Sequence, residues 1–372
     1  MLVGIVDMFA PFLPQNGDVG QYHRAAVFVA DHLRAGNVVT AVQLSEPIQV
    51  SAYSVPLGVL YALTVSASVV GIALNSGAWS ITVLLWLKIA RRLYPDIRIH
   101  VMGLLFVLYP APVRFMSRTL RDALPLLCIT ILMLVFVRWL QDERDWWTVA
   151  GLGFVVPLVL LRVELVPPLC LGALAGWAYK HRTELTRWRV AALAVAILTS
   201  TPTFLWLEQN FGPGFLPTRL SGFEATRQNL VDGPNPYLVD LAYQSWFDIP
   251  LYAPVRLFYL LYSPFPWVLS SFELFLAATD ALFILPLSLI AVYTLVRWRD
   301  RIRAEVVFAL VYAFTMLLGY SLVVSTKGAA SRRRLYAVPL LIVVAGFGLI
   351  QLLERQCDRS TNQNANQQYD AK

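Results

Sequence analysis

Long apolar runs separated by short charged loops are the feature that most limits what this chain can fold into. A transmembrane helix needs roughly 20 consecutive apolar residues, and several runs approach that length. Hydrophobic residues make up 58% of the 372 residues and charged residues 14%, and the mean hydropathy is +0.60. Soluble domains carry about 25% charged residues. The sequence therefore predicts an all-α, polytopic helical membrane protein with about 9–10 transmembrane helices.

The predicted spans and the polar segments divide the chain into one membrane domain, 1–353, and a tail. The spans are 70–90, 100–113, 120–138, 147–161, 165–179, 190–207, 275–296, 304–325 and 335–353. A further apolar stretch, 54–66, starts near Pro56 and is interpreted as a half-helix at the membrane interface. Another, 251–270, contains three prolines, which interrupt a continuous span, and is interpreted as interfacial or re-entrant. The polar segments are a first loop, 1–53, and a large loop, 208–274. The tail, 354–372, has low hydrophobicity and is predicted to be disordered.

Placing both long loops outside puts the whole formal excess of seven positive charges on the inside, as the positive-inside rule requires. This predicts a cell-membrane protein with a cytoplasmic C-terminus. The cluster of Lys327, Arg332, Arg333 and Arg334 then lies on the external face, against the rule. Lipid headgroups or nearby acids would explain it, and so would a bound anion such as the phosphate of a lipid-linked substrate.

Asp18 is the first acidic candidate for chemistry. It follows a turn at Asn16 and Gly17 and begins a pattern of apolar residues at helical spacing. An Asp at this place can serve as an N-cap, and a carboxylate at the membrane surface can also act as a general base. The two roles are compatible.

Two further charged pairs stand at the edges of apolar runs. Arg121 and Asp122 stand at the outer end of the 120–138 run and could pair with each other or hold a phosphate or a divalent ion. Arg162 and Glu164 lie between two apolar runs with no polar loop around them. They could satisfy a hairpin turn as a self-contained pair, or face the bundle interior as functional groups.

Several function classes have no motif in this chain. There is no glycine-rich dinucleotide fingerprint, P-loop, HExxH or CxxC pair, and the three cysteines lack metal-ligand spacing. The basic residues form short clusters between apolar runs, which is typical of membrane loops and argues against nucleic acid as a partner. A nucleotide-sugar donor has no recognisable site, so any sugar donor is expected to be lipid-linked.

The order of several motifs resembles the C-type superfamily of membrane glycosyltransferases, the dolichyl-phosphate-mannose protein mannosyltransferases and their bacterial relatives. The matching stretches are "GDVGQYHRAAVFVADHLRAG", "SVPLGVLYAL", "LNSGAWSITVLLWLKIARRLYP", "LYPAPVRFMSRTLRDALPLLCITIL", "LLRVEL" and "SRRRLYAVPLLIVVAGFGL". Together they run from about residue 16 to residue 350, in the family's order.

This resemblance implies a catalytic Asp in the first external loop, which falls on Asp18, with Asp7 as the weaker candidate. It implies a polyprenyl-phosphate-sugar donor, inversion at the anomeric carbon, and outer-face cations that hold the leaving phosphate. Arg332, Arg333 and Arg334 match that place. Lys327 belongs to the same basic cluster, and Arg121 is a further outer-face cation at the start of the 120–138 run. Some relatives use a divalent cation, for which Asp122 is the candidate, supported by Arg162 and Glu164. The acceptor would be a glycan, a lipid or a protein.

Two departures from the family pattern leave alternatives open. The family has a membrane span before the Asp loop, of which "MLVGIVDMF" would be the last turns, and Asp18 is followed by Val19 where relatives often carry a second acid. The second functional hypothesis is a polymerase or ligase acting on polyprenyl-diphosphate-linked glycans, which would suit the long 208–250 loop. A transporter or flippase ranks third, because no internal repeat is visible.

Overall fold

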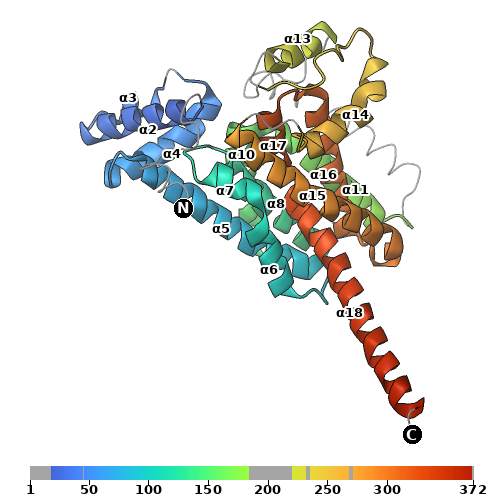
Figure 1. Cartoon of the computed structure of the whole chain (residues 1–372). Coiled ribbons are helices and arrows are strands. Elements are labelled where there is room, and N and C mark those ends of the chain that lie inside the picture. The colour runs from blue at the N-terminus through green and yellow to red at the C-terminus, as the bar shows by residue number, and fades with distance from the viewer. Residues whose placement is uncertain (1–17, 45, 184–219, 232–234, 268–270, 371–372) are drawn as a thin grey trace.

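The protein is an all-α, multi-pass membrane protein, described here from a computed structural model (Figure 1). The structure describes residues 18–44, 46–183, 220–231, 235–267 and 271–370, without the side chains of residues 223, 230, 273 and 356–370. Within these ranges the regular elements are helices, and the only extended pairing is an isolated bridge between Pro236 and Thr326.

Six helical segments among the described residues are long and apolar enough to cross a membrane. Four of them are single helices, or the apolar part of one. They are α5 (Ser68–Leu93), α8 (Ala123–Leu140), α15 (Phe272–Arg297) and α16 (Ala304–Val323). The fifth is the first part of α18 (Val338–Asp370), and the sixth is a broken stretch, Trp146–Lys180. It consists of α9 (Trp146–Leu152), α10 (Val155–Arg162), η1 (Val163–Leu165) and α11 (Val166–Lys180).

A seventh crossing is formed if α6 and α7 count together. Helix α6 (Ile99–Leu108) and helix α7 (Pro110–Met116) are bent by 55° at Tyr109. Pro110 lacks a backbone N–H and its ring clashes with the preceding turn, so a helix cannot run straight through this point. Breaks of this kind are tolerated at membrane depth where protein surrounds them, and Tyr109 is buried.

The count of six or seven is lower than the predicted 9–10 because it merges two of the predicted spans and does not reach a third. The predicted spans 147–161 and 165–179 belong to one broken stretch, and the span 190–207 lies outside the described residues. The broken stretch nevertheless folds back on itself. Arg162 contacts Asp122 at the start of α8, whereas the Lys180 amine donates to the Leu140 carbonyl oxygen at its end, at 2.7 Å.

The remaining helices are short and lie between the spans. They are α2 (Asp18–Arg34), α3 (Val38–Val42), α4 (Ile48–Leu63), α13 (Leu220–Val231), α14 (Asp248–Tyr262), η2 (Arg299–Arg301) and α17 (Lys327–Arg334). Two of them, α4 and α14, overlap the segments predicted to be interfacial, and neither reaches the length of a span. The predicted disorder of 354–372 stays a prediction, and helix α18 continues through this tail to Asp370. No Pro or Gly interrupts it there.

Polar contacts join loops that the charge pattern predicts to share one side of the membrane. At the end of the bundle opposite α17, Arg92 pairs with Glu143 at 2.7 Å and Arg301 pairs with Asp96 at 3.4 Å. The Tyr179 hydroxyl also donates to the Ile302 carbonyl oxygen. The loops after α5, α8 and α15 and the end of α11 therefore meet at one end of the bundle.

Close helix approach in this bundle depends on glycine. Helix α11 packs along α16, and a Cβ added at Gly172 would lie 2.7 Å from the Phe308 carbonyl oxygen. Helix α2 packs along α4, where a Cβ at Gly58 would lie 2.5 Å from the Val29 side chain. Small residues at such crossings permit the van der Waals contact that holds membrane helices together. The second crossing matters most here, because α2 begins with Asp18.

Candidate functional site

Helix α17 carries three consecutive arginines near its C-terminal end, and backbone contacts hold its N-terminal end in place. At its start the Tyr237 backbone N–H donates to the Ser325 carbonyl oxygen at 2.8 Å, beside the bridge to Thr326. Successive residues of an α-helix point about 100° apart, so the three arginines must reach three different places. The structure confirms this divergence, and it separates residues that the sequence grouped together.

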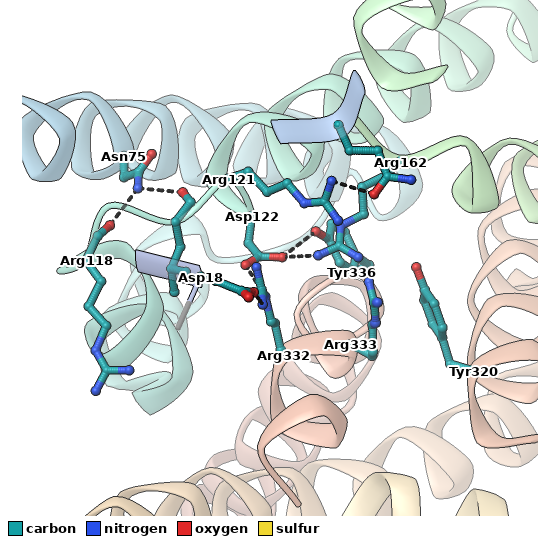
Figure 2. A network of polar contacts seen from close by, with 12 residues as sticks. Asp18, Asn75, Arg118, Arg121, Asp122, Arg162, Tyr320, Arg332, Arg333 and Tyr336 are labelled. Atoms are coloured by element: carbon teal, nitrogen blue, oxygen red, sulfur yellow. Dashed lines mark hydrogen bonds and ion pairs between the residues drawn. The ribbon is translucent and has the colours of Figure 1, made fainter. Parts of the chain in front are cut away.

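Arg332 reaches a buried carboxylate at the start of α8 (Figure 2). Its Nε donates to Asp122 Oδ2, and its Nη1 lies 2.6 Å from Asp18 Oδ2. The other oxygen of Asp122 accepts from Arg162 Nη2 at 2.5 Å and from the Tyr336 hydroxyl at 3.1 Å. Asp122 is fully buried, whereas 55% of the Asp18 side chain is exposed.

Arg162 connects this carboxylate to a second one. Its Nη1 lies 3.1 Å from Glu164 Oε1, on the short helix η1 that turns the chain back between α10 and α11. The same oxygen lies 3.4 Å from Arg333 Nη1 and accepts from the Tyr320 hydroxyl at 3.4 Å. The Arg333 guanidinium also stacks over the Tyr320 ring. We call the connected set the Asp122 cluster: Asp18, Asp122, Arg162, Glu164, Tyr320, Arg332, Arg333 and Tyr336.

The loop before α8 is held so that Asp122 points into the cluster. The Asn75 side chain on α5 donates to the carbonyl oxygens of Arg118 and Leu120, each at 2.7 Å (Figure 2). Arg121 donates to Gln49 on α4 at 2.7 Å, and its charge also acts on Asp122. Helix α4 thus supports both Asp18, through its packing with α2, and the loop that carries Asp122.

Asp122 and Arg332 keep their charges at neutral pH. Burial raises the pKa of the Asp122 carboxyl, but Arg332 and Arg162 outweigh that effect and hold the pKa at about 2. Burial lowers the pKa of Arg332, and the Asp122 carboxylate more than compensates, so the pKa lies above its usual value. The arginines that act on Asp122 are Arg121, Arg162 and Arg332, and Arg333 adds a fourth positive charge beside Glu164. The cluster has three carboxylates, so the cluster together with the neighbouring Arg121 carries one more positive than negative side chain.

Arg334, grouped with Arg332 and Arg333 in the sequence-based prediction, lies elsewhere. It is buried on another face of α17, 2.6 Å from Asp280 on α15, and donates to the carbonyl oxygens of Leu261 and Ser263. These contacts tie α17 to the end of α14 and to α15, which is a structural task. Lys327 begins α17, and its backbone N–H donates to the Asn235 carbonyl oxygen. Asp7 lies outside the described residues.

The described residues contain no group of three His, Cys, Asp or Glu side chains that could hold a metal ion. Both oxygens of Asp122 already contact arginines. Neighbouring guanidinium groups would repel a divalent cation. The geometry therefore gives Asp122 the task of orienting Arg332 and Arg162, and offers no support for the hypothesis that Asp122 is a metal ligand.

Sequence reasoning missed the two tyrosines and the polar supports. Tyr336 follows the arginine triplet by two residues, and Tyr320 stands one turn before the end of α16. Both look like ordinary interfacial aromatics in the sequence. Asn75 and Gln49 lie in apolar helices. An uncharged polar side chain in such a helix indicates a hydrogen bond to a neighbouring segment, and this was the one sequence signal available for them.

Comparisons with protein-family models, with curated proteins and with solved structures give no match to this chain. The residues and their geometry therefore carry the functional argument.

Proposed function

We propose that this protein is a membrane-embedded inverting glycosyltransferase, which moves a sugar from a polyprenyl-phosphate donor to an acceptor on the external face of the cell membrane. The observation that carries the proposal is the position of Arg332 between Asp18 and Asp122. It joins the candidate general base to the candidate phosphate-binding cations, although Asp18 and Arg332 are 314 positions apart. The resemblance to the C-type glycosyltransferases supports the same assignment.

The proposed reaction uses the charges of the cluster in a defined way. An acceptor hydroxyl gives its proton to Asp18 as its oxygen attacks the anomeric carbon of the donor. The bond from that carbon to the phosphate oxygen breaks, and the phosphate leaves with the electron pair. Arg332 and Arg333 neutralise the negative charge that grows on the leaving phosphate, which stabilises the transition state more than the ground state.

The exposure of the groups fits these two tasks. Asp18 is more than half exposed and can meet an acceptor from outside the bundle, whereas Arg332 is 19% exposed and anchored by Asp122 from behind. An anchored cation needs little reorganisation when charge develops on a neighbouring phosphate. In the described state Asp18 pairs with Arg332, so an incoming phosphate would compete for this guanidinium and release the base.

The first test is mass spectrometry of lipid extracts from cells that lack the protein. Those cells would be compared with cells that carry the wild type, Asp18→Asn or Asp31→Asn. Asp31 is the matched control, because it lies exposed on the same helix and pairs only with Arg34 among the contacts of the described residues. We expect a polyprenyl monophosphate bearing one sugar to accumulate without the protein and with Asp18→Asn, but not with Asp31→Asn.

The other outcomes distinguish the alternatives. Accumulation of oligosaccharides on polyprenyl diphosphate would favour a polymerase or ligase. Unchanged lipids in cells that lack the protein would contradict both enzymatic hypotheses and direct attention to transport. Normal lipids with Asp18→Asn, despite a lipid phenotype in the deletion strain, would remove Asp18 as the base.

A further inference from the structure

Glu164 uses only one of its two carboxylate oxygens within the protein. Oε1 lies within 3.4 Å of Arg162, Arg333 and Tyr320. Oε2 is buried and has no hydrogen-bond partner among the described residues. The side chain is 10% exposed. A buried carboxylate oxygen without a donor is costly, so this atom is suited to accept a hydrogen bond from a group outside the chain.

Two donors of the same cluster are also without a partner in the described part of the chain. They are Nη2 of Arg332 and Nε of Arg162, both buried. The Arg162 guanidinium holds Asp122 on one terminal nitrogen and Glu164 on the other. Since Asp122 in turn holds Arg332, the open acceptor and the open donors belong to one chain of contacts, from Glu164 through Arg162 and Asp122 to Arg332.

The complementary ligand must offer both acceptors and a donor. Phosphate oxygens satisfy the arginine donors, and a hydroxyl group satisfies Glu164 Oε2. A metal cation would fit the carboxylate but is repelled by Arg162 and Arg333, which flank it. A sugar attached to a phosphate carries both required groups next to each other.

We propose that Glu164 binds a hydroxyl group of the transferred sugar, and that it is thereby the residue that distinguishes a glycosylated polyprenyl phosphate from the bare lipid phosphate. This inference rests on the proposed function and adds the site of sugar recognition to it. Arg333 and Tyr320 orient the carboxylate from one side and Arg162 from the other. The carboxylate must rotate or Arg333 must move to admit the sugar, because Oε2 is covered in the described state.

The test is a competition-binding measurement with purified full-length protein in lipid nanodiscs. The probes are bare polyprenyl monophosphate and the same lipid carrying mannose, glucose, galactose or arabinose. The proteins are the wild type, Glu164→Ala, Glu164→Gln and Glu143→Gln. Glu143 is the matched control, because it also bridges two arginines, Arg92 and Arg138, at the opposite end of the bundle. Thermal unfolding of each variant shows whether it is folded.

We expect the wild type and Glu143→Gln to bind the best glycosylated lipid about tenfold more tightly than bare polyprenyl phosphate, as one charge-assisted hydrogen bond predicts. Glu164→Ala should reduce this ratio to near one without weakening bare phosphate binding. Glu164→Gln keeps the shape of the side chain but loses its charge, so its affinity ratio should lie between that of the wild type and that of Glu164→Ala. This variant decides the test if the alanine variant does not fold.

A folded Glu164→Ala variant with the wild-type ratio would overturn the inference and leave the lipid-phosphate site standing. So would a wild type that binds every glycosylated lipid no better than the bare phosphate. A wild type that binds none of the lipid phosphates would overturn both this inference and the proposed function.

Discussion

Asp122 is the residue on which the cluster depends. It is fully buried and accepts hydrogen bonds from Arg162, Arg332 and Tyr336. Its replacement by Asn would remove the carboxylate that Arg162 and Arg332 share and leave each with one other carboxylate, Glu164 or Asp18. Breaking a buried ion pair from one side typically costs about 3–5 kcal/mol. We expect Asp122→Asn to lower the midpoint of thermal unfolding in detergent. Asp142→Asn, which breaks the exposed pair with Lys180, should leave the midpoint nearly unchanged.

The same carboxylate predicts a pH dependence of stability. Its pKa is about 2 in the folded protein, below the ordinary value of 3.8 that applies to the unfolded chain. A lowered pKa stabilises the fold above the unfolded value, and this contribution is lost as the pH falls through the folded one. It amounts to about 2 kcal/mol and should disappear between about pH 4 and pH 2. The difference in unfolding free energy between the wild type and Asp122→Asn should therefore narrow as the pH falls across this range; a constant difference would contradict the assigned pKa.

At the scale of elements, the crossing of α2 and α4 positions Asp18. A Cβ at Gly58 would lie 2.5 Å from the Val29 side chain and 2.8 Å from the Ala26 carbonyl oxygen, so the helices would have to separate. We expect Gly58→Ala to destabilise the protein by about 1–3 kcal/mol, because the crossing cannot absorb a methyl group. It should also lower the proposed transfer activity by moving Asp18 away from Arg332.

The control for this prediction is Gly77 on α5, where a Cβ would meet nothing within 4 Å. Gly77→Ala should leave activity unchanged and stability equal or slightly higher, since alanine favours a helix over glycine by about 0.5–1 kcal/mol. Thermal unfolding and lipid turnover measured on both variants would check the pair. Equal effects at the two positions would mean that the α2–α4 approach does not control the site.

The elements differ in how far the sequence predicts them. Apolar run length locates α5, α8, α15 and α16 to within a few residues, because the bilayer imposes that length on any crossing helix. Local signals stand at the break between α6 and α7, where Pro110 lies, and at the fold-back near η1, where Arg162 and Glu164 lie between two apolar runs. Which neighbours bury these two breaks depends on tertiary packing, and no local pattern contains that information. Helix α18 extends into the polar tail, and composition alone does not predict this, since it measures the ability to form a core rather than the continuation of a helix that has already begun.

The candidate site was predictable only in part, because tertiary packing decides which charged residues meet. Charged residues in apolar surroundings identify Asp122, Arg162 and Glu164, because burying a charge in a membrane needs a purpose or a partner. Which partner each one has depends on helix rotation. Arg332 and Arg334 are two positions apart in the sequence, yet one reaches Asp122 and the other Asp280. The tyrosines that complete the cluster have no distinguishing sequence signal at all.

At the scale of the whole molecule, the two ends of the bundle carry different kinds of charge pairs. The end that carries α17 holds buried pairs, whereas the opposite end holds exposed ones such as Arg301 with Asp96. The charge pattern of the loops predicts that the exposed end faces the cytoplasm and the Asp122 cluster faces outside. A phosphate site that serves external acceptors requires this orientation, so the proposed function depends on it.

Cysteine labelling of intact cells tests the orientation. In a background without Cys128, Cys170 and Cys357, single cysteines would replace Asn229 on α13 or Arg144 between α8 and α9, both exposed. A membrane-impermeant maleimide should label Asn229→Cys in intact cells, and should label Arg144→Cys only after the cells are opened. The reverse pattern would place the Asp122 cluster in the cytoplasm, where an external acceptor could not reach Asp18, and the proposed reaction would then require a cytoplasmic acceptor.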